Sequence, residues 1–256
     1  MLTPDSLRLD GRVALVTGSG RNIGRAVAEA FAAAGAKVVV NGHSDGDAIE
    51  SVARGIRDRG GEAIAVLADV ARDDHVAALV ERTIAAFGGL DILVSNVGIR
   101  RYRPFLEITP DEWNEVIGTN LSAAFYLSRH ALPHMRVKQK GRIIVISGFD
   151  GFWGQVTHRA PNLAAKAGLH GLAKAIAREF GPDGITANTV APGAIDTVRD
   201  WTQYVHQPRE QIEAEIPLKR FGHVDELAGA CLFLASDAGG FVSGQVIHVN
   251  GGHYMY

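Results

Sequence analysis

The chain of 256 residues is 46% hydrophobic and 21% charged, enough to bury one large core, and we expect a single α/β domain over residues 1–256. Its formal net charge of −2 at pH 7 indicates no nucleic-acid partner and no membrane-surface partner. No uncharged apolar run approaches the roughly 18 residues of a membrane span, Met1–Asp5 shows no signal-peptide pattern, and the single Cys231 allows no intrachain disulfide, so we expect a cytoplasmic protein.

Short runs rich in Val and Ile alternate with helical patterns along the chain. Such alternation with short connections predicts βαβ units, and hence a Rossmann-type, doubly wound fold with a seven-stranded parallel sheet and helices on both faces. The longest irregular stretch late in the chain, Asp196–Glu215, is a candidate lid around residues 196–216. In chain order we predict a strand at Val13–Thr17, a helix at Ile23–Ala34, a strand at Lys37–Val40, a helix at Asp47–Arg59, a strand at Ala63–Ala68, a helix at Asp74–Phe87, a strand at Ile92–Ser95, a helix at Asp111–Met135, a strand at Arg142–Ile146, a helix at Asn162–Phe180, a strand at Ile185–Val190, a helix at Asp225–Ala235 and a strand at Val246–Val249.

The first predicted strand runs directly into a glycine-rich turn that opens a helix. Glycines let the backbone approach a pyrophosphate closely, and the N–H groups and dipole at a helix N-terminus favour an anion there. A glycine pattern is specific only in this context of strand, turn and helix. The candidate phosphate-binding turn is Thr17-Gly18-Ser19-Gly20-Arg21-Asn22-Ile23-Gly24.

This turn resembles the Thr-Gly-x-x-x-Gly-x-Gly motif of the short-chain dehydrogenase/reductase family, with Asn22 in place of the middle glycine. Segments similar to the later family motifs follow in order: Ala68-Asp69-Val70, Leu93-Val94-Ser95-Asn96-Val97-Gly98, Thr119-Asn120-Leu121, Val190-Ala191-Pro192-Gly193-Ala194-Ile195-Asp196-Thr197 and Val242–Gly252. The resemblance covers essentially the whole chain and implies a nicotinamide dinucleotide as cofactor. Besides the turn, it implies cofactor contacts at Asp69, Val70, Asn96, Val97, Gly98, Asn120, Lys166, Pro192, Gly193, Ile195 and Thr197.

The residues after the second predicted strand favour NADP(H) over NAD(H). An acidic residue there would accept hydrogen bonds from the ribose of NAD and repel a 2′-phosphate, but this strand is followed by the neutral Asn41. Arg21, His43 and Ser44 can donate hydrogen bonds to a phosphate. Asp45, slightly later, argues in the other direction.

The catalytic positions depart from the family pattern. The resemblance implies a tetrad of Asn, Ser, Tyr and Lys, of which Asn120 and Lys166 are present. The tyrosine position, four residues before Lys166, is Asn162, and an amide has no proton to give near neutral pH. The serine falls most naturally on Gly148, with Ser147 one place early, so that a local shift is needed to bring Ser147 into the site.

Other side chains are candidates for the missing proton donor. His158 titrates near neutrality, and Asp150 could act as an acid if burial raised its pKa. Asn162 itself could hold a carbonyl oxygen by a hydrogen bond. The 2,4-dienoyl-CoA reductases, a branch of the family, also lack this tyrosine and have a proline before its position, as Pro161 is here.

These observations predict an NADP(H)-dependent oxidoreductase that reduces a carbonyl or an activated C=C bond of a small-molecule substrate with a non-standard proton donor. The alternative is a non-redox protein of the same fold, either a ligand or cofactor sensor, a partner subunit, or a lyase or isomerase. His130 and His134 stand four apart, but no third ligand accompanies them and we expect no metal. The resemblance implies a homo-tetramer, with a dimer as the alternative.

Overall fold

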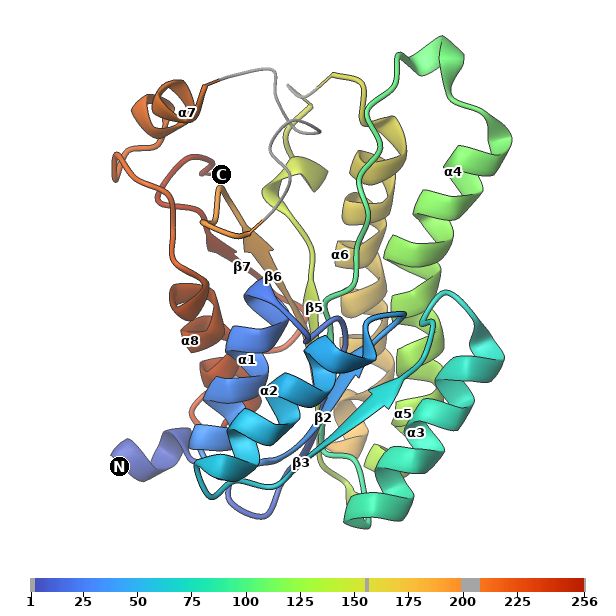
Figure 1. The fold of residues 1–256 in the computed structure, drawn as a ribbon, viewed down its shortest axis with the longest axis vertical. Coiled ribbons are helices and arrows are strands. Elements are labelled where there is room, and N and C mark those ends of the chain that lie inside the picture. Colours follow the sequence, from blue (N-terminus) through green and yellow to red (C-terminus); the bar gives the residue numbers. More distant parts are fainter. Residues whose placement is uncertain (1–2, 155–156, 199–207, 256) are drawn as a thin grey trace.

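One parallel sheet forms the centre of the molecule (Figure 1). The computed structural model describes residues 3–154, 157–198 and 208–255, and within them the strands lie in the order β3-β2-β1-β4-β5-β6-β7. The predicted seven-stranded, doubly wound sheet is therefore confirmed. Every residue of β1 and β4 is buried, as expected for central strands with both faces covered. The strands are β1 Val13–Val16, β2 Lys37–Gly42, β3 Ala63–Leu67, β4 Ile92–Ser95, β5 Gly141–Ile146, β6 Ile185–Pro192 and β7 Val246–Val249.

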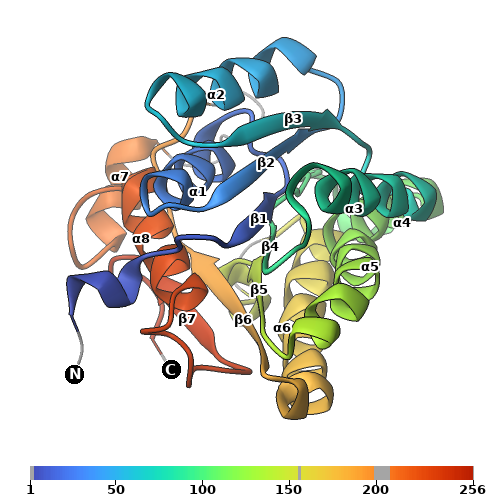
Figure 2. The ribbon, with the colours of Figure 1, turned by 90° about the horizontal axis from the view of Figure 1, so that it is seen from below.

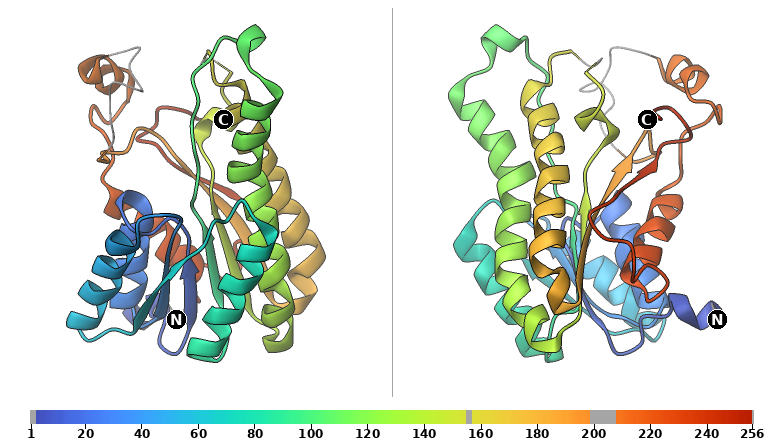
Figure 3. Two further views of the ribbon diagram at one scale, coloured as in Figure 1. Left: turned by 45° about the vertical axis from the view of Figure 1, so that its right-hand side comes forward. Right: turned by 180° about the vertical axis from the view of Figure 1, so that it is seen from behind.

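Helices cover both faces of the sheet (Figures 2 and 3). On one face α1, α2 and α8 bury side chains such as Phe31 and Leu227 in one core cluster. On the other face α3, α5 and α6 bury side chains such as Leu79 and Leu127 in a second cluster. None of the helices among the described residues is long and apolar enough to cross a bilayer. The helices are α1 Asn22–Ala33, α2 Gly46–Asp58, α3 Asp73–Phe87, α4 Pro110–Ile117, α5 Ala123–Lys138, α6 Ala160–Phe180, α7 Arg209–Glu215 and α8 Val224–Ala235.

The order of the sheet reverses between β1 and β4, whose carboxyl ends lie side by side. In open α/β sheets ligands bind in the crevice at such a switch point. The turn after β1 and the loop after β4 both carry predicted cofactor contacts, so the topology places these contacts where a dinucleotide is expected.

The predicted helix Asp111–Met135 is interrupted by a π-helical turn. The structure divides it into α4, the π turn Gly118–Ser122 and α5, which continues past Pro133 to Lys138. The single turn of wider helix contains Asn120, a candidate site residue. Such π turns are frequent at functional sites and are not visible in a hydrophobic period.

The candidate lid is not irregular throughout. Residues 208–215 include the short helix α7, in which Arg209 and Glu213 form an i,i+4 ion pair at 2.9 Å and Pro208 precedes the first turn. The expectation of an irregular segment was wrong there, because Arg209 also pairs with Asp196 at 3.1 Å and lies over the ring of Phe221, so tertiary contacts add to the local pair. Residues 199–207 of the candidate lid lie outside the described residues.

Two glycine substitutions test how closely the turn after β1 is packed. A Cβ on Gly24 would overlap the carbonyl oxygen of Gly18 and lie 2.7 Å from Asn96 Nδ2, whereas a Cβ on Gly55, inside α2, would meet only Arg59 Nη1 at 3.5 Å. We expect Gly24→Ala to lower the free energy of unfolding by about 1–3 kcal/mol. Gly55→Ala should raise it by about 0.5–1 kcal/mol, since alanine favours a helix. Denaturant unfolding measures both, and equal stability of Gly24→Ala and the parent chain would contradict the packing.

Candidate active site

Asn96, directly after β4, fixes the glycine-rich turn. Its Nδ2 donates to the carbonyl oxygens of Thr17 and Gly18 at 3.0 and 3.2 Å, and its N–H donates to Thr17 Oγ1 at 3.0 Å. A Cβ on Gly18, which has φ 59°, would lie 3.0 Å from Val97 Cγ2. The turn is thus closed against β4 at positions where only glycine fits, and it leads into the N-terminus of α1. This geometry fits the phosphates of a dinucleotide.

Ser19 links the same turn to β2. Its buried hydroxyl donates to the carbonyl of Val16 at 2.6 Å and accepts from the N–H of Asn41 at 3.0 Å. Its hydroxyl therefore holds the two strand ends in register. Next to it, Gly20 lies against the first turn of α2, where a Cβ would meet Ile49 Cγ2 at 3.2 Å.

Asn22 adopts the left-handed conformation of a glycine and adds a contact of its own. Its φ is 51°, a region that Asn tolerates better than other non-glycine residues. Its Nδ2 donates to the carbonyl of Val198 at 3.0 Å, and its Oδ1 accepts from the N–H of Val198 at 2.9 Å. This pair of hydrogen bonds, the Asn22 latch, ties the start of α1 to the segment after β6. It borders a cavity of about 450 Å³ lined by α1, residues 196–198 and residues 223–225.

The side chains that we expect to determine the preference between NADP(H) and NAD(H) lie at the carboxyl end of β2 or beside it. Asn41 is buried and donates to the carbonyls of Val66 and Ala68 at 3.1 and 3.2 Å, so its amide is used within the sheet. Arg21 and Ser44 are exposed, and so is His43, whose ring lies 3.7 Å from the carboxylate of Asp69. The carboxylate of Asp69 therefore lies beside one of the expected phosphate donors, His43.

The loop after β6 contacts β7 and the residue that follows it. The N–H of Gly193 donates to the carbonyl of Val249 at 2.9 Å, and a Cβ on Gly193 would lie 2.7 Å from Asn250 Cα. Ile195 is buried, and the hydroxyl of Thr197 donates to the carbonyl of Ile195 at 3.5 Å.

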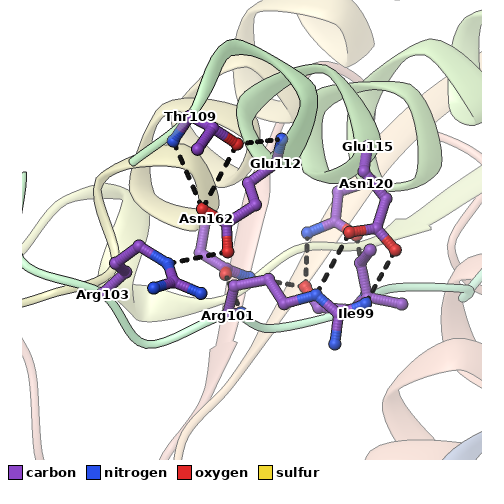
Figure 4. Close-up of polar contacts among 8 residues, drawn as sticks. All are labelled: Ile99, Arg101, Arg103, Thr109, Glu112, Glu115, Asn120 and Asn162. Atoms are coloured by element: carbon purple, nitrogen blue, oxygen red, sulfur yellow. Dashed lines mark hydrogen bonds and ion pairs between the residues drawn. The ribbon is translucent and has the colours of Figure 1, made fainter. Parts of the chain in front are cut away.

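Two buried asparagines converge on the peptide of Ile99, in the loop after β4 (Figure 4). Asn120 Nδ2 and Asn162 Nδ2 donate to the carbonyl of Ile99 at 2.9 and 2.8 Å, and Asn120 Oδ1 accepts from its N–H at 2.7 Å. Asn162 Oδ1 accepts from the N–H of Arg101 at 3.4 Å. Asn120 is 3% exposed and Asn162 is 2% exposed. We call this arrangement the asparagine clamp; in it the amide of Asn162 is already used by the backbone.

Two arginines of the loop after β4, Arg101 and Arg103, form ion pairs with carboxylates of α4 (Figure 4). Arg101 pairs with Glu115 at 2.7 Å, and Arg103 pairs with Glu112 at 2.7 Å. Glu112 also closes the capping box with Thr109 at the start of α4. These pairs attach the loop to α4, so both guanidinium groups are paired with carboxylates of this chain.

Lys166 lies between the ends of β4 and β5. Its Nζ donates to the carbonyl of Ile146 at 3.0 Å, and a Cβ on Gly98 would be 3.6 Å from that nitrogen. Burial lowers the pKa of Lys166 to about 8, with a further lowering by Arg100 and an opposing effect of Asp150. Gly148, at the family's serine position, faces the lysine, since a Cβ there would lie 3.8 Å from Lys166 Cγ.

The other catalytic candidates, Ser147, Asp150 and His158, differ in their burial and in the groups that they contact. Ser147 is buried, and its hydroxyl donates to the carbonyl of Val190 on β6 at 3.2 Å. Asp150 pairs with Arg159 at 3.1 Å, and the two side chains are only 12% and 8% exposed. His158 is exposed with φ 63°, and its carbonyl accepts from the N–H of Arg103 at 2.8 Å. The structure thus groups Asn120, Asn162, Asp150 and Lys166, turns Ser147 toward β6 and leaves His158 on the surface.

Sequence reasoning missed Arg159 and the aromatic packing that holds the loop after β5. Nothing in the spacing of Asp150 and Arg159 indicates a pair, because it forms across an irregular loop. Phe152 stacks on His170 of α6 with ring centroids 4.2 Å apart, and burial lowers the pKa of His170 to about 4. A Cβ on Gly151 would lie 2.8 Å from the backbone nitrogen of Ala167, so the loop rests directly on α6.

Comparison with known proteins agrees with this geometry. A family model described as enoyl-(acyl carrier protein) reductase matches residues 18–254. The chain is 41% identical over 251 residues to the 3-oxoacyl-[acyl-carrier-protein] reductase FabG of Escherichia coli K12, covering 97% of this chain and 100% of the relative. The chain belongs to the short-chain dehydrogenase/reductase family.

Solved structures of this family superpose closely. A gluconate 5-dehydrogenase from Burkholderia cenocepacia J2315, in complex with NADP and tartrate, matches with a TM-score of 0.90 and 36% identity over 97% of each chain. A dehydrogenase/reductase from Sinorhizobium meliloti 1021 matches with a TM-score of 0.91 and 33% identity over 98% of each chain. Proteins of the short-chain dehydrogenase/reductase family bind nicotinamide cofactors, and the turn between β1 and α1 fits that group.

Asn22→Gly removes the Asn22 latch without straining the backbone, because glycine adopts a positive φ readily. We expect hydrogen exchange of the Val198 amide to become at least about tenfold faster, since its acceptor is lost. Asn22→Ala removes the same contacts but keeps a Cβ at φ 51°, so it should in addition lower the free energy of unfolding by about 1 kcal/mol. Unchanged exchange at Val198 in both variants would contradict the latch.

Asn162→Ala tests the asparagine clamp. The N–H of Arg101 loses its acceptor and the carbonyl of Ile99 loses one of two donors, so we expect the free energy of unfolding to fall by about 1–3 kcal/mol in denaturant titrations. Asn114→Ala is the matched control, because Asn114 is exposed on α4, and it should change stability by no more than about 0.5 kcal/mol. Equal effects of the two substitutions would show that the clamp contributes nothing.

Proposed function

We propose that this chain is an NADP(H)-dependent oxidoreductase that reduces a carbonyl or an activated C=C bond of a small molecule, with a proton donor other than a tyrosine at position 162. The observation that carries the proposal is that a glycine turn, closed so that Gly18 and Gly24 tolerate no side chain, lies at the same sheet edge as the partly buried Lys166. A chain that retained only the fold would need neither feature. The names of its relatives, an oxoacyl reductase and a sugar-acid dehydrogenase, support redox chemistry on oxygen-bearing carbon.

Each part of the site has a role in this proposal. The turn after β1 and the N-terminus of α1 hold the pyrophosphate, and Lys166 holds the nicotinamide ribose. The bound cofactor supplies a hydride. The asparagine clamp fixes the loop after β4, and the Asp150–Arg159 pair fixes the loop after β5, so that the two walls of the substrate site stand in a set position.

A preference for NADP(H) would come from Arg21, His43 and Ser44. The guanidinium of Arg21, at the residue before α1, and the side chains after β2 can surround a 2′-phosphate, and Asn41 adds no negative charge. A solved relative in complex with NADP supports this choice. The carboxylate of Asp69 near His43 is the feature that argues for NAD(H).

The alternative is a non-redox role for the same pocket. It is favoured by one observation: the amide of Asn162, in the position of the family's tyrosine, is committed to the backbone of Ile99 and Arg101. A sensor or partner subunit would bind the cofactor without turnover.

We further propose that one domain spans residues 1–256 and that the chain assembles as a homo-tetramer, with a dimer as the alternative. Exposed apolar side chains on α4 and α5, Trp113 and Phe125, support an assembly.

Fluorescence titration with NADPH and NADH in parallel tests the proposal. We expect tighter binding of NADPH, and we expect Arg21→Ala to weaken NADPH binding by about tenfold while NADH binding is unchanged, since a charge-assisted hydrogen bond is worth about 1.5–3 kcal/mol. Arg25→Ala is the matched control, because Arg25 lies one turn further along α1 and pairs with Glu29 at 3.3 Å.

Turnover on a panel of ketones and enones completes this test. NADPH binding with no oxidation of NADPH across the panel would favour the sensor role. If neither NADPH nor NADH binds, both the oxidoreductase proposal and the cofactor-sensor alternative are wrong.

A further inference from the structure

The identity of the proton donor is open once position 162 is an asparagine, and this inference rests on the proposed function. The amide of Asn162 cannot transfer a proton near neutral pH. The hydroxyl of Ser147 donates to the carbonyl of Val190, on the neighbouring strand. Asp150 is a carboxylate in an ion pair with Arg159, an acceptor of hydrogen bonds. None of these three groups is placed to act as an acid.

Lys166 is placed differently. Its ammonium group lies at the carboxyl ends of β4 and β5 and donates a hydrogen bond to the carbonyl of Ile146 at 3.0 Å. An ammonium has three protons, so others remain for the ribose and for a substrate oxygen. The nitrogen is therefore held by one backbone atom at the edge of the sheet where the glycine turn also lies.

The departures from the family pattern open the space around this lysine. A side chain at position 148 would lie against the stem of Lys166, 3.8 Å from Cγ and 3.9 Å from Cδ, but the residue there is glycine. The side chain at position 162 is drawn away to the peptides of Ile99 and Arg101. Neither the serine nor the tyrosine of the family stands between the ammonium group and a substrate.

We propose that Lys166 is itself the proton donor of the reduction, in place of the tyrosine. One N–H bond of the ammonium breaks, and its proton forms the O–H bond of the product alcohol as hydride from the reduced nicotinamide reaches the carbon. In an enone the same proton goes to the enolate formed by hydride addition. The electron pair of the broken bond stays on Nζ, which then takes a proton from water, and the atoms and charges balance.

The charges around Lys166 suit this role. Arg100, from the loop after β4, and the burial of the amine favour the neutral form, while Asp150, from the loop after β5, favours the ammonium. On its own helix His170 lies one turn away, and its neutral form adds no charge because its pKa is about 4. β5 contributes only the uncharged carbonyl of Ile146. With a pKa of about 8, Lys166 is protonated at neutral pH and still gives up its proton far more readily than an exposed lysine.

Lys166→Arg is the decisive variant. Arginine keeps the charge and can hydrogen-bond a ribose, but its guanidinium does not lose a proton in the accessible pH range. We expect unchanged NADPH binding by fluorescence and a fall in kcat of about 100-fold or more. Lys174→Arg, at an exposed position two turns further along α6, is the matched control and should leave both quantities unchanged.

A second readout needs no cofactor and no turnover. In protein labelled with 13C-lysine, the Cε resonance of Lys166, assigned by its loss in Lys166→Arg, should titrate near pH 8. In the wild-type protein kcat for reduction should fall as the pH rises through this value, because the acid must be protonated.

Two results would overturn the inference alone: turnover by Lys166→Arg at the wild-type rate, or a Cε titration near the ordinary value of about 10.4. Wild-type protein that binds NADPH but turns over no carbonyl or enone would overturn the proposed function, and this inference with it.

Discussion

The peptide of Ile99, held by two buried amides, determines the arrangement of the site. Asn120 comes from the π turn between α4 and α5, and Asn162 comes from the first turn of α6, so three segments far apart in the chain meet at one carbonyl. A carbonyl oxygen has two lone pairs, and here two side-chain amides, both buried, donate to the partly buried carbonyl of Ile99. The loop after β4 is thereby fixed beside Lys166, and the lysine's surroundings follow from it.

Two asparagines stand where the family pattern has other residues, and they act in the same way. Asn22 takes the place of a glycine and binds the N–H and carbonyl of Val198. Asn162 takes the place of a tyrosine and binds the carbonyl of Ile99 and the N–H of Arg101. A side-chain amide carries a donor and an acceptor, so it can pair with backbone much as another strand would. Asn162 therefore exchanges a chemical role for attachment of a loop at the edge of the site, whereas Asn22 keeps the left-handed conformation of a glycine and adds such an attachment.

The fold and the glycine-rich turn could be predicted from the sequence, and the contacts of the catalytic candidates could not. The strands and the glycine turn are local patterns, visible as apolar runs and as residues required at a tight turn, and the doubly wound parallel sheet followed from the alternation. The ion pair of Asp150 with Arg159 and the use of Asn162 by Ile99 depend on where irregular loops run, which no period encodes. Ser147 is an example. The sequence shows that it lies one place before the expected serine, but only the structure shows that its hydroxyl donates a hydrogen bond to β6. The π turn was hidden for the same reason, since the apolar pattern runs on through it.

The π turn Gly118–Ser122 also determines what a one-residue deletion between α4 and α5 would do to the site. A π turn holds one residue more than the α-helical turn it replaces. Deleting one residue within it would let α4 and α5 join as one regular helix, and because the α-helical turn that forms needs one residue fewer, the buried face of α5, with Leu127 and Met135, would still face the sheet. The bulge itself would be lost, and with it the position from which Asn120 reaches the peptide of Ile99. A one-residue deletion here would therefore keep the packing of the helix and remove one side of the asparagine clamp, and an alignment gap at this point would mark a protein whose site is built differently.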